Sequence, residues 1–293
     1  MVSNKIRNYF LIMVIGAIAV ALIGYYYTQK DLPPYPGKIK SVSGSVISGK
    51  AKIMAGQKIW QKYGLMDLGS VWGHGTYRGP DFTAQALHLM STTMRQLKAQ
   101  QDHGSAYYAL NTDDKGSVDA TVIKQIKTNQ YNAADDVLVL TDLQVHALIK
   151  NRQFYDDLFS KGDKNGPIRP DTIKSAVDRS DLADFFFWTA WCAGTIRHGD
   201  NHTYTNNWPH DPEVGNFVSG KSLVWSAISL IVFGFMLALI IFIFHKYGFN
   251  KGSLPYREEP ARLMADAPIS SSQRKTAKFF FVVSALFVLQ TIM

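Results

Sequence analysis

The chain has 293 residues, with 31 lysines and arginines against 23 acidic residues and a formal net charge of +8. Its single cysteine, Cys192, excludes an intramolecular disulfide, a Cys-rich zinc site, a dinuclear copper centre and the paired thioether bonds that normally hold a c-type haem. Because the neighbouring residues 185–193 are almost all apolar, we interpret this thiol as a small buried hydrophobic group.

Two long uncharged runs and the beginning of a third predict membrane-spanning helices. Residues 9–27 carry no charge, and such a run forms about 28 Å of helix, the thickness of a bilayer core. Residues 223–244 form a second run, and residues 279–293 begin a third that is still apolar at the last residue. The first run resembles a cleaved signal in part, but the three tyrosines at 25–27 suit a membrane interface and favour a retained anchor.

The distribution of charge predicts the topology. Residues 1–8 carry a net charge of +2, residues 246–278 carry +4, and the much longer segment 28–222 carries only +2. Positive charge concentrated in short flanks favours a cytoplasmic location for them and an outside location for residues 28–222. We interpret the basic balance as a topology signal, because no basic run with interleaved aromatic residues indicates nucleic-acid binding.

The segment between the first two runs is predicted to be one mostly helical domain. A helix is expected to begin at Gly79-Pro80-Asp81, with proline at its first position, and residues 141–144 read as a capping box. Residues 137–140 are a strand candidate, residues 181–196 read as a mostly buried helix, and residues 101–119 and 161–170 read as polar loops. One apolar helical face is predicted from the spacing of Leu87, Met90, Met94 and Leu97.

Two motifs stand out, Gly73-His74-Gly75-Thr76-Tyr77 and Tyr204-Thr205-Asn206-Asn207-Trp208-Pro209-His210. Together they resemble the N-terminal part of quinol-dependent, single-chain nitric oxide reductases. In the related cytochrome c subunit of the two-subunit enzymes, a Cys-x-x-Cys-His precedes a similar Gly-x-Gly-x-Tyr turn. Here the corresponding positions are Leu65-Met66-Asp67-Leu68-Gly69, which provide neither thiol nor imidazole. The resemblance therefore implies a haem-free domain.

The resemblance implies a membrane protein of mostly α structure, located as a multi-pass protein in the bacterial cytoplasmic membrane with its large domain extracytoplasmic. The expected domains are a transmembrane helix at 9–27, a haem-free cytochrome c-like domain at 28–222, a second transmembrane helix at 223–244, a cytoplasmic loop at 245–278 and the start of a truncated third helix at 279–293.

The implied reaction of the complete enzyme is the reduction of two NO by quinol to N₂O, water and quinone. Its implied cofactors are two b-type haems, a non-haem iron and calcium, and its partners are the lipid bilayer, the remaining membrane helices of the same enzyme and quinol. Because the family's haem and iron ligands lie beyond position 293, no catalytic residue is assigned here, and the chain alone is expected to hold no cofactor and to be inactive.

One metal contact is implied within this chain. In the two-subunit enzymes the glycine-rich turn helps to coordinate a calcium ion that bridges haem propionates, and the resemblance carries this role to Gly75 and Tyr77. The alternative is a turn that only docks the domain. The loop with His198, His202 and His210 also admits two interpretations, a metal site or a set of donors to headgroups, propionates or a neighbouring domain.

Two other classes of protein remain as alternatives. A membrane-bound sensor or ligand-binding protein fits the topology of residues 1–245, although residues 250–272 show no heptad pattern that would transmit a signal. An oxidase-like electron-entry subunit is disfavoured by the lone cysteine and by a domain that lies between the apolar runs. No P-loop, dinucleotide fingerprint, nucleophile elbow or His-Glu-x-x-His is present.

Overall fold

The computed structural model describes residues 4–217 and 220–247, together with Phe280 and Ser284. By its internal contacts the chain divides into two units, residues 1–224 and residues 225–293. Within the described residues, the helices of the first unit are α1 (Asn4–Lys30), α2 (Lys50–Lys62), α3 (Phe82–His103), α4 (Thr112–Lys127), α5 (Asp142–Lys161) and α6 (Ala176–Gly194), with short 3₁₀ turns η1 (Leu65–Asp67), η2 (Tyr107–Ala109) and η3 (Pro212–Val214).

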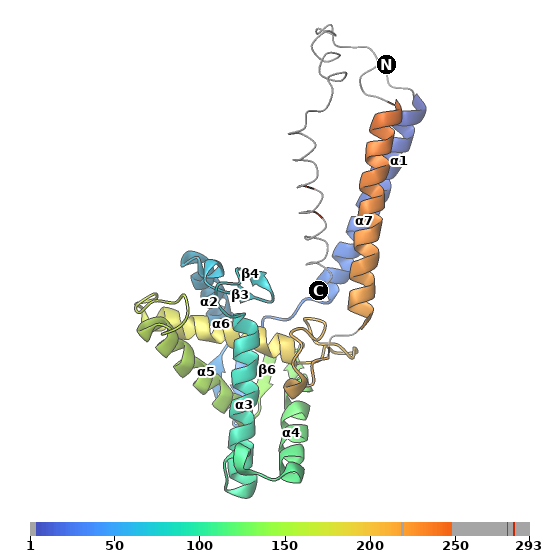
Figure 1. Cartoon of the computed structure of the whole chain (residues 1–293). Coiled ribbons are helices and arrows are strands. Elements are labelled where there is room, and N and C mark those ends of the chain that lie inside the picture. The colour runs from blue at the N-terminus through green and yellow to red at the C-terminus, as the bar shows by residue number, and fades with distance from the viewer. Residues whose placement is uncertain (1–3, 218–219, 248–279, 281–283, 285–293) are drawn as a thin grey trace. The chain divides into compact units, whose positions relative to one another are not determined.

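Helix α6 is the centre of the domain. Its residues 182–194 are all buried, which is expected for a helix that is apolar on every side, and it packs against α2, α3 and α5 (Figure 1). Aromatic rings fill the contact region, and the rings of Phe82 and Phe186 stack with centroids 4.7 Å apart. The other large rings in this cluster are Trp60, Tyr155 and Phe159.

Local capping signals fix where the helices begin. The predicted capping box of α5 is confirmed, since the Thr141 hydroxyl accepts from Gln144 N–H and the Gln144 side chain accepts from Thr141 N–H. Helix α3 begins at Phe82 with Asp81 as its N-cap, so Pro80 lies before the cap and not at the first helical position. Residues 101–119 are not one loop, because α4 begins at Thr112.

Two small sheets accompany the helices. The larger has the strand order β2-β1-β6-β5, in which β1 (Lys38–Ser41) and β6 (Val137–Leu140) are parallel neighbours and the edge strands β2 (Val46–Ser48) and β5 (Tyr131–Asn132) are antiparallel to them. The inner face of this sheet is buried. Strand β6 confirms the strand that the sequence predicted at residues 137–140. The second sheet is a hairpin of β3 (Ser70–Val71) and β4 (His74–Gly75).

The prediction of a membrane protein with transmembrane helices is wrong for the part of the chain that the structure describes. Residues 9–27 do lie in helix α1, and residues 223–244 lie in helix α7 (Gly220–Tyr247). No helix among the described residues, however, combines the length and the apolar character needed to cross a bilayer. The absence of charge favours a helix, but crossing a bilayer also requires a sufficiently long and sustained apolar stretch within that helix.

Helix α7 contains almost all of the described residues of the second unit. The predicted cytoplasmic loop at 245–278 lies outside the described residues, apart from residues 245–247, which belong to α7. The predicted start of a third helix at 279–293 likewise lies outside them, apart from Phe280 and Ser284.

Candidate functional site

The glycine-rich motif forms the β3–β4 hairpin. Ser70 pairs with Gly75 and Val71 with His74, which leaves Trp72 and Gly73 as a two-residue turn with φ of 52° and 75°. Positive φ at both central residues is the conformation of the type I′ hairpin turn. It is unusual for tryptophan and therefore needs support from neighbouring groups.

That support comes from helices α3 and α6. The Trp72 backbone N–H donates to the Thr83 hydroxyl at 3.2 Å, and its indole N–H donates to the carbonyl of Thr189 at 3.3 Å. The indole also lies against Trp188, with ring centroids 5.4 Å apart. The turn is thus fixed to the aromatic core.

Asp81 connects the hairpin to the first turn of α3. One carboxylate oxygen accepts from Ala84 N–H at 2.9 Å, as an N-cap does. The other accepts from the Ser70 hydroxyl at 2.7 Å and from Gly73 N–H at 2.9 Å. A single side chain therefore sets both the start of the helix and the position of the hairpin.

The two residues for which a calcium contact is predicted lie at the outer end of the hairpin. Gly75 has φ of 141°, and a Cβ there would lie 2.3 Å from the Gly69 carbonyl oxygen, so only glycine fits. The Tyr77 side chain is 93% exposed. Among the described residues no group of three or more His, Cys, Asp or Glu side chains could hold a metal ion, and the calcium contact stays a prediction.

The second motif lies next to the first. The Tyr204 ring packs on Trp191 with centroids 5.7 Å apart, its hydroxyl accepts from Asn129 Nδ2 at 3.0 Å, and burial raises the pKa of its hydroxyl. Further along the loop, the Trp208 indole lies 3.6 Å from the position that a Cβ on Gly73 would occupy. The structure therefore brings the two motifs together at Gly73 and Trp208.

The three histidines of this loop have separate contacts. His198 Nε2 donates to the Tyr131 carbonyl at 2.9 Å, whereas His202 Nδ1 lies 3.0 Å from the Asp200 carboxylate. The hydrogen bond from His202 lowers the pKa of Asp200. His210 instead faces the ring of Phe217, with centroids 6.1 Å apart. These contacts do not converge on one point, so the described geometry does not support the metal-site interpretation of the loop.

The positions that correspond to the haem-attachment motif do not fit a c-type haem. Leu65 is fully buried in the core and lies in η1. At Gly69, where the motif has its histidine, a Cβ would lie 2.5 Å from the Pro80 carbonyl oxygen and 2.6 Å from the Phe82 ring. An imidazole therefore has no room here, in addition to the missing thiols.

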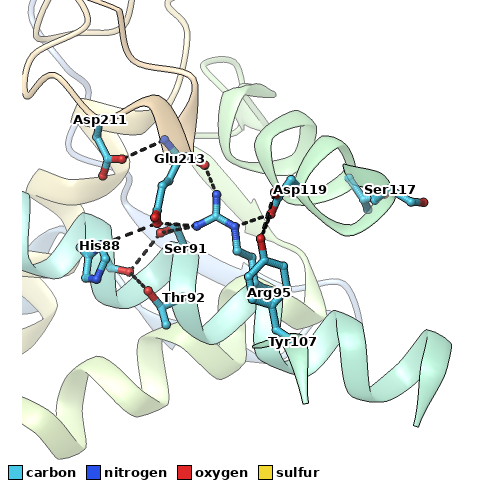
Figure 2. Close-up of polar contacts among 10 residues, drawn as sticks. His88, Ser91, Thr92, Arg95, Tyr107, Ser117, Asp119, Asp211 and Glu213 are labelled. Carbon is cyan, nitrogen blue, oxygen red and sulfur yellow. Dashed lines mark hydrogen bonds and ion pairs between the residues drawn. The ribbon is translucent and has the colours of Figure 1, made fainter. Parts of the chain in front are cut away.

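A cluster around Arg95 was missed by the sequence reasoning (Figure 2). Arg95 is 5% exposed, and its guanidinium binds Asp119 at 2.6 Å, the Glu213 carboxylate at 2.8 Å and the Glu213 carbonyl. The Tyr107 hydroxyl donates to Asp119 at 2.8 Å, and burial, followed by this hydrogen bond, raises its pKa to about 12. The burial of Arg95 could have been predicted from its spacing, because it follows Leu87 and Ser91 at intervals of four residues on the buried face of α3.

These features describe a class of protein: a mostly helical domain with a close-packed aromatic core and a glycine-rich hairpin fixed to it. Residues 36–210 match the family model of the cytochrome c-like domain of NorB, a nitric oxide reductase subunit. Since this match covers more than half of the chain, the protein belongs to that family. No curated protein matches the chain. The predicted resemblance to nitric oxide reductase is thereby confirmed at the level of a NorB-type protein.

Proposed function

We propose that this domain belongs to a quinol-dependent, single-chain nitric oxide reductase, in which it is a haem-free domain. The reaction would be the reduction of two NO by quinol to N₂O, water and quinone. The packing at Gly69 supports the proposal, since a domain that cannot hold a c-type haem cannot relay electrons from a soluble cytochrome through one. Electrons would therefore enter the enzyme directly from quinol.

In this proposal the redox centres are held by parts of the enzyme other than this domain. They comprise two b-type haems and a non-haem iron, with calcium at the contact between the parts and the quinol site among those other parts. Within this chain, Gly75 would supply a backbone carbonyl and Tyr77 a hydroxyl near the calcium ion. Both are oxygen ligands of the kind that calcium accepts. The extracytoplasmic location of residues 28–222 stays a prediction.

The domain would dock on the haem-bearing remainder of the enzyme through the surface where the two motifs meet. The observation that carries this assignment is the packing of Trp208 over Gly73, because it places the turn of the hairpin and a polar loop side by side. Tyr77, at 93% exposure, and Phe217, at 60%, offer aromatic area that this unit does not bury. Exposed aromatic side chains of this kind are enriched at protein interfaces.

The haem-free assignment is tested by expressing the full chain together with the cytochrome c maturation machinery. Denaturing gels stained for haem peroxidase activity are expected to show no band at 32.8 kDa. In parallel, the enzyme assembled with its haem-bearing remainder should consume NO with quinol as donor but not with reduced cytochrome c. A stained band, or turnover driven by cytochrome c, would contradict the proposal.

The docking surface is tested with Tyr77→Ala in this chain, with the haem-bearing remainder of the enzyme supplied as a separate chain so that association can be measured. The matched control is Tyr108→Ala, because Tyr108 is also exposed, at 76%, but lies in η2, away from both motifs. We expect Tyr77→Ala to weaken association with the remainder of the enzyme by about tenfold, as loss of an aromatic anchor does, and the control to change little. Equal behaviour of the two variants would exclude the hairpin as the contact.

A further inference from the structure

The outer face of the four-stranded sheet carries two lysines beside two valines. Side chains alternate between the faces of a strand, so the burial of Ile39 and Leu138 on the inner face places their neighbours outside. The parallel register of β1 and β6 pairs Lys38 with Val137 and Lys40 with Val139. Each lysine therefore lies beside a half-buried valine.

This face is hollowed. An open cavity of about 410 Å³ lies over it, lined by Lys38, Lys40, Asn132, Asp135, Val137 and Val139. This lining combines aliphatic side chains with charged ends. The cavity lies on different strands from the β3–β4 hairpin, so it is separate from the site described above.

The charged groups that line the cavity lie on β1 and at the β5–β6 turn. Among the described residues, neither Lys38 nor Lys40 forms an ion pair with an acidic side chain. The two nearby carboxylates are bonded locally instead, Asp135 by Asn132 Nδ2 at 2.7 Å and Asp136 by the Tyr131 hydroxyl at 3.0 Å. The cavity thus presents two positive groups along β1 and one negative group at the β5–β6 turn.

The spacing of the two lysines indicates what kind of ligand fits. Residues two apart on one strand are separated by about 6.6 Å, which is also the spacing of alternate side chains in an extended peptide. A glutamate placed over either valine can cover it with its methylene groups while its carboxylate reaches the adjacent lysine. The carboxylate of Asp135, which belongs to the same lining, disfavours a ligand that is negative along its whole length.

We propose that this sheet face binds an extended acidic segment of a partner protein that carries glutamates at alternate positions. Lys38 and Lys40 bind two of its carboxylates, and Val137 and Val139 pack against their stems. Carboxylate recognition by exposed lysines is electrostatic and weakens with salt. The proposal goes beyond the reductase assignment and does not depend on it.

The test uses the full chain and a fluorescein-labelled, end-blocked heptapeptide in which threonine and glutamate alternate. We expect saturable binding by fluorescence anisotropy that weakens as salt rises. Charge reversal in Lys38→Glu/Lys40→Glu should lower the affinity by at least about tenfold. The matched control Lys58→Glu/Lys150→Glu makes the same change in net charge at two exposed helical lysines of α2 and α5 and should leave binding unchanged.

Three further probes test the nature of the ligand. A peptide with glutamine in place of glutamate should not bind, and one with aspartate should bind more weakly, because its shorter stem covers less of the valines. A single-stranded oligonucleotide of the same charge should lose no more affinity in Lys38→Glu/Lys40→Glu than in the control Lys58→Glu/Lys150→Glu. The proposal would be overturned if the peptide does not bind, or if the control reversal lowers its affinity as much as Lys38→Glu/Lys40→Glu does. It would also be overturned if the oligonucleotide depends on Lys38 and Lys40 more strongly than the peptide does.

Discussion

At the scale of single residues, Arg95 joins parts of the domain that are distant in the sequence. Its guanidinium spans from Asp119 on α4 to Glu213 in η3, while Tyr107 fixes the far side of Asp119. A buried guanidinium is stable only when its donors are satisfied. Here the fork geometry of arginine satisfies several acceptors at once. The cluster in Figure 2 therefore holds the segment after α6 against helices α3 and α4.

We expect Arg95→Met to destabilise the domain by about 1–3 kcal/mol, because it removes charged hydrogen bonds while both acidic partners remain partly hydrated. The control is Lys98→Met on the same helix, which breaks the i,i+4 pair of Lys98 with Asp102 and should cost less than about 0.5 kcal/mol. Urea unfolding followed by circular dichroism measures both. Similar losses for the two variants would show that the Arg95 cluster contributes no more than a surface pair.

The partly buried Lys127 predicts that the stability of the domain depends on pH. Burial lowers its pKa from 10.5 to about 8, so between these values the unfolded chain binds more protons than the folded chain. The free energy of unfolding should therefore rise with pH in this window. We expect the wild type to gain stability between pH 8 and about pH 9.5 relative to Lys127→Met, and parallel curves for the two proteins would contradict this. The range stops there because the raised pKa of tyrosines such as Tyr107 acts in the opposite direction above pH 10.

At the scale of elements, short-range sequence patterns predicted where the helices form better than they predicted which elements those helices contact. The capping box at Thr141 and the apolar face of α3 follow from residues three or four apart, and both are present. Helix α4 was hidden because its cap, Asn111, opens a polar and acidic first turn that resembles a loop. The charge-free runs at 9–27 and 223–244 predicted helices correctly, but no helix among the described residues is long and apolar enough to cross a membrane.

In the candidate site, too, local structure could be predicted from the sequence but long-range contacts could not. The glycine-rich turn could be predicted from its composition, since positive φ favours glycine. Its packing against Trp208 could not be predicted, because no local pattern connects positions so far apart in the sequence. The same holds for the parallel pairing of β1 with β6, which brings together the lysines and valines of the outer sheet face.

The hairpin also gives a prediction at this scale. Gly75→Ala should destabilise the domain by about 1–3 kcal/mol, since φ of 141° is strained for alanine and its Cβ would meet the Gly69 carbonyl at 2.3 Å. Gly116→Ala is the matched control, because no atom lies within 4 Å of its Cβ position in α4. It should stabilise by about 0.5–1 kcal/mol through helix propensity. Thermal unfolding of both variants measures the difference, and a neutral Gly75→Ala would contradict the described turn.

At the scale of the whole domain, the packing of the aromatic core opposes haem binding in addition to the missing cysteines. Trp60, Phe82 and Phe186 lie in mutual contact next to residues 65–69, which correspond to the attachment motif. Interiors are packed as densely as organic crystals, so there is no spare volume for a porphyrin. Introducing the attachment ligands without removing these rings should therefore not produce haem binding.

The triple variant Leu65→Cys/Leu68→Cys/Gly69→His tests this directly. Expressed with the cytochrome c maturation machinery, it should yield no folded protein that carries covalent haem, because the new imidazole would collide with the Phe82 ring and the Pro80 carbonyl. The double variant Leu65→Cys/Leu68→Cys separates the effects, since it adds both thiols without the collision and should remain closer to wild-type stability. Haem staining and the visible spectrum measure cofactor binding, and near-ultraviolet circular dichroism measures the packing of the core. A folded triple variant with a low-spin haem spectrum would mean that the core opens easily, and that the absence of cysteines alone keeps this domain free of haem.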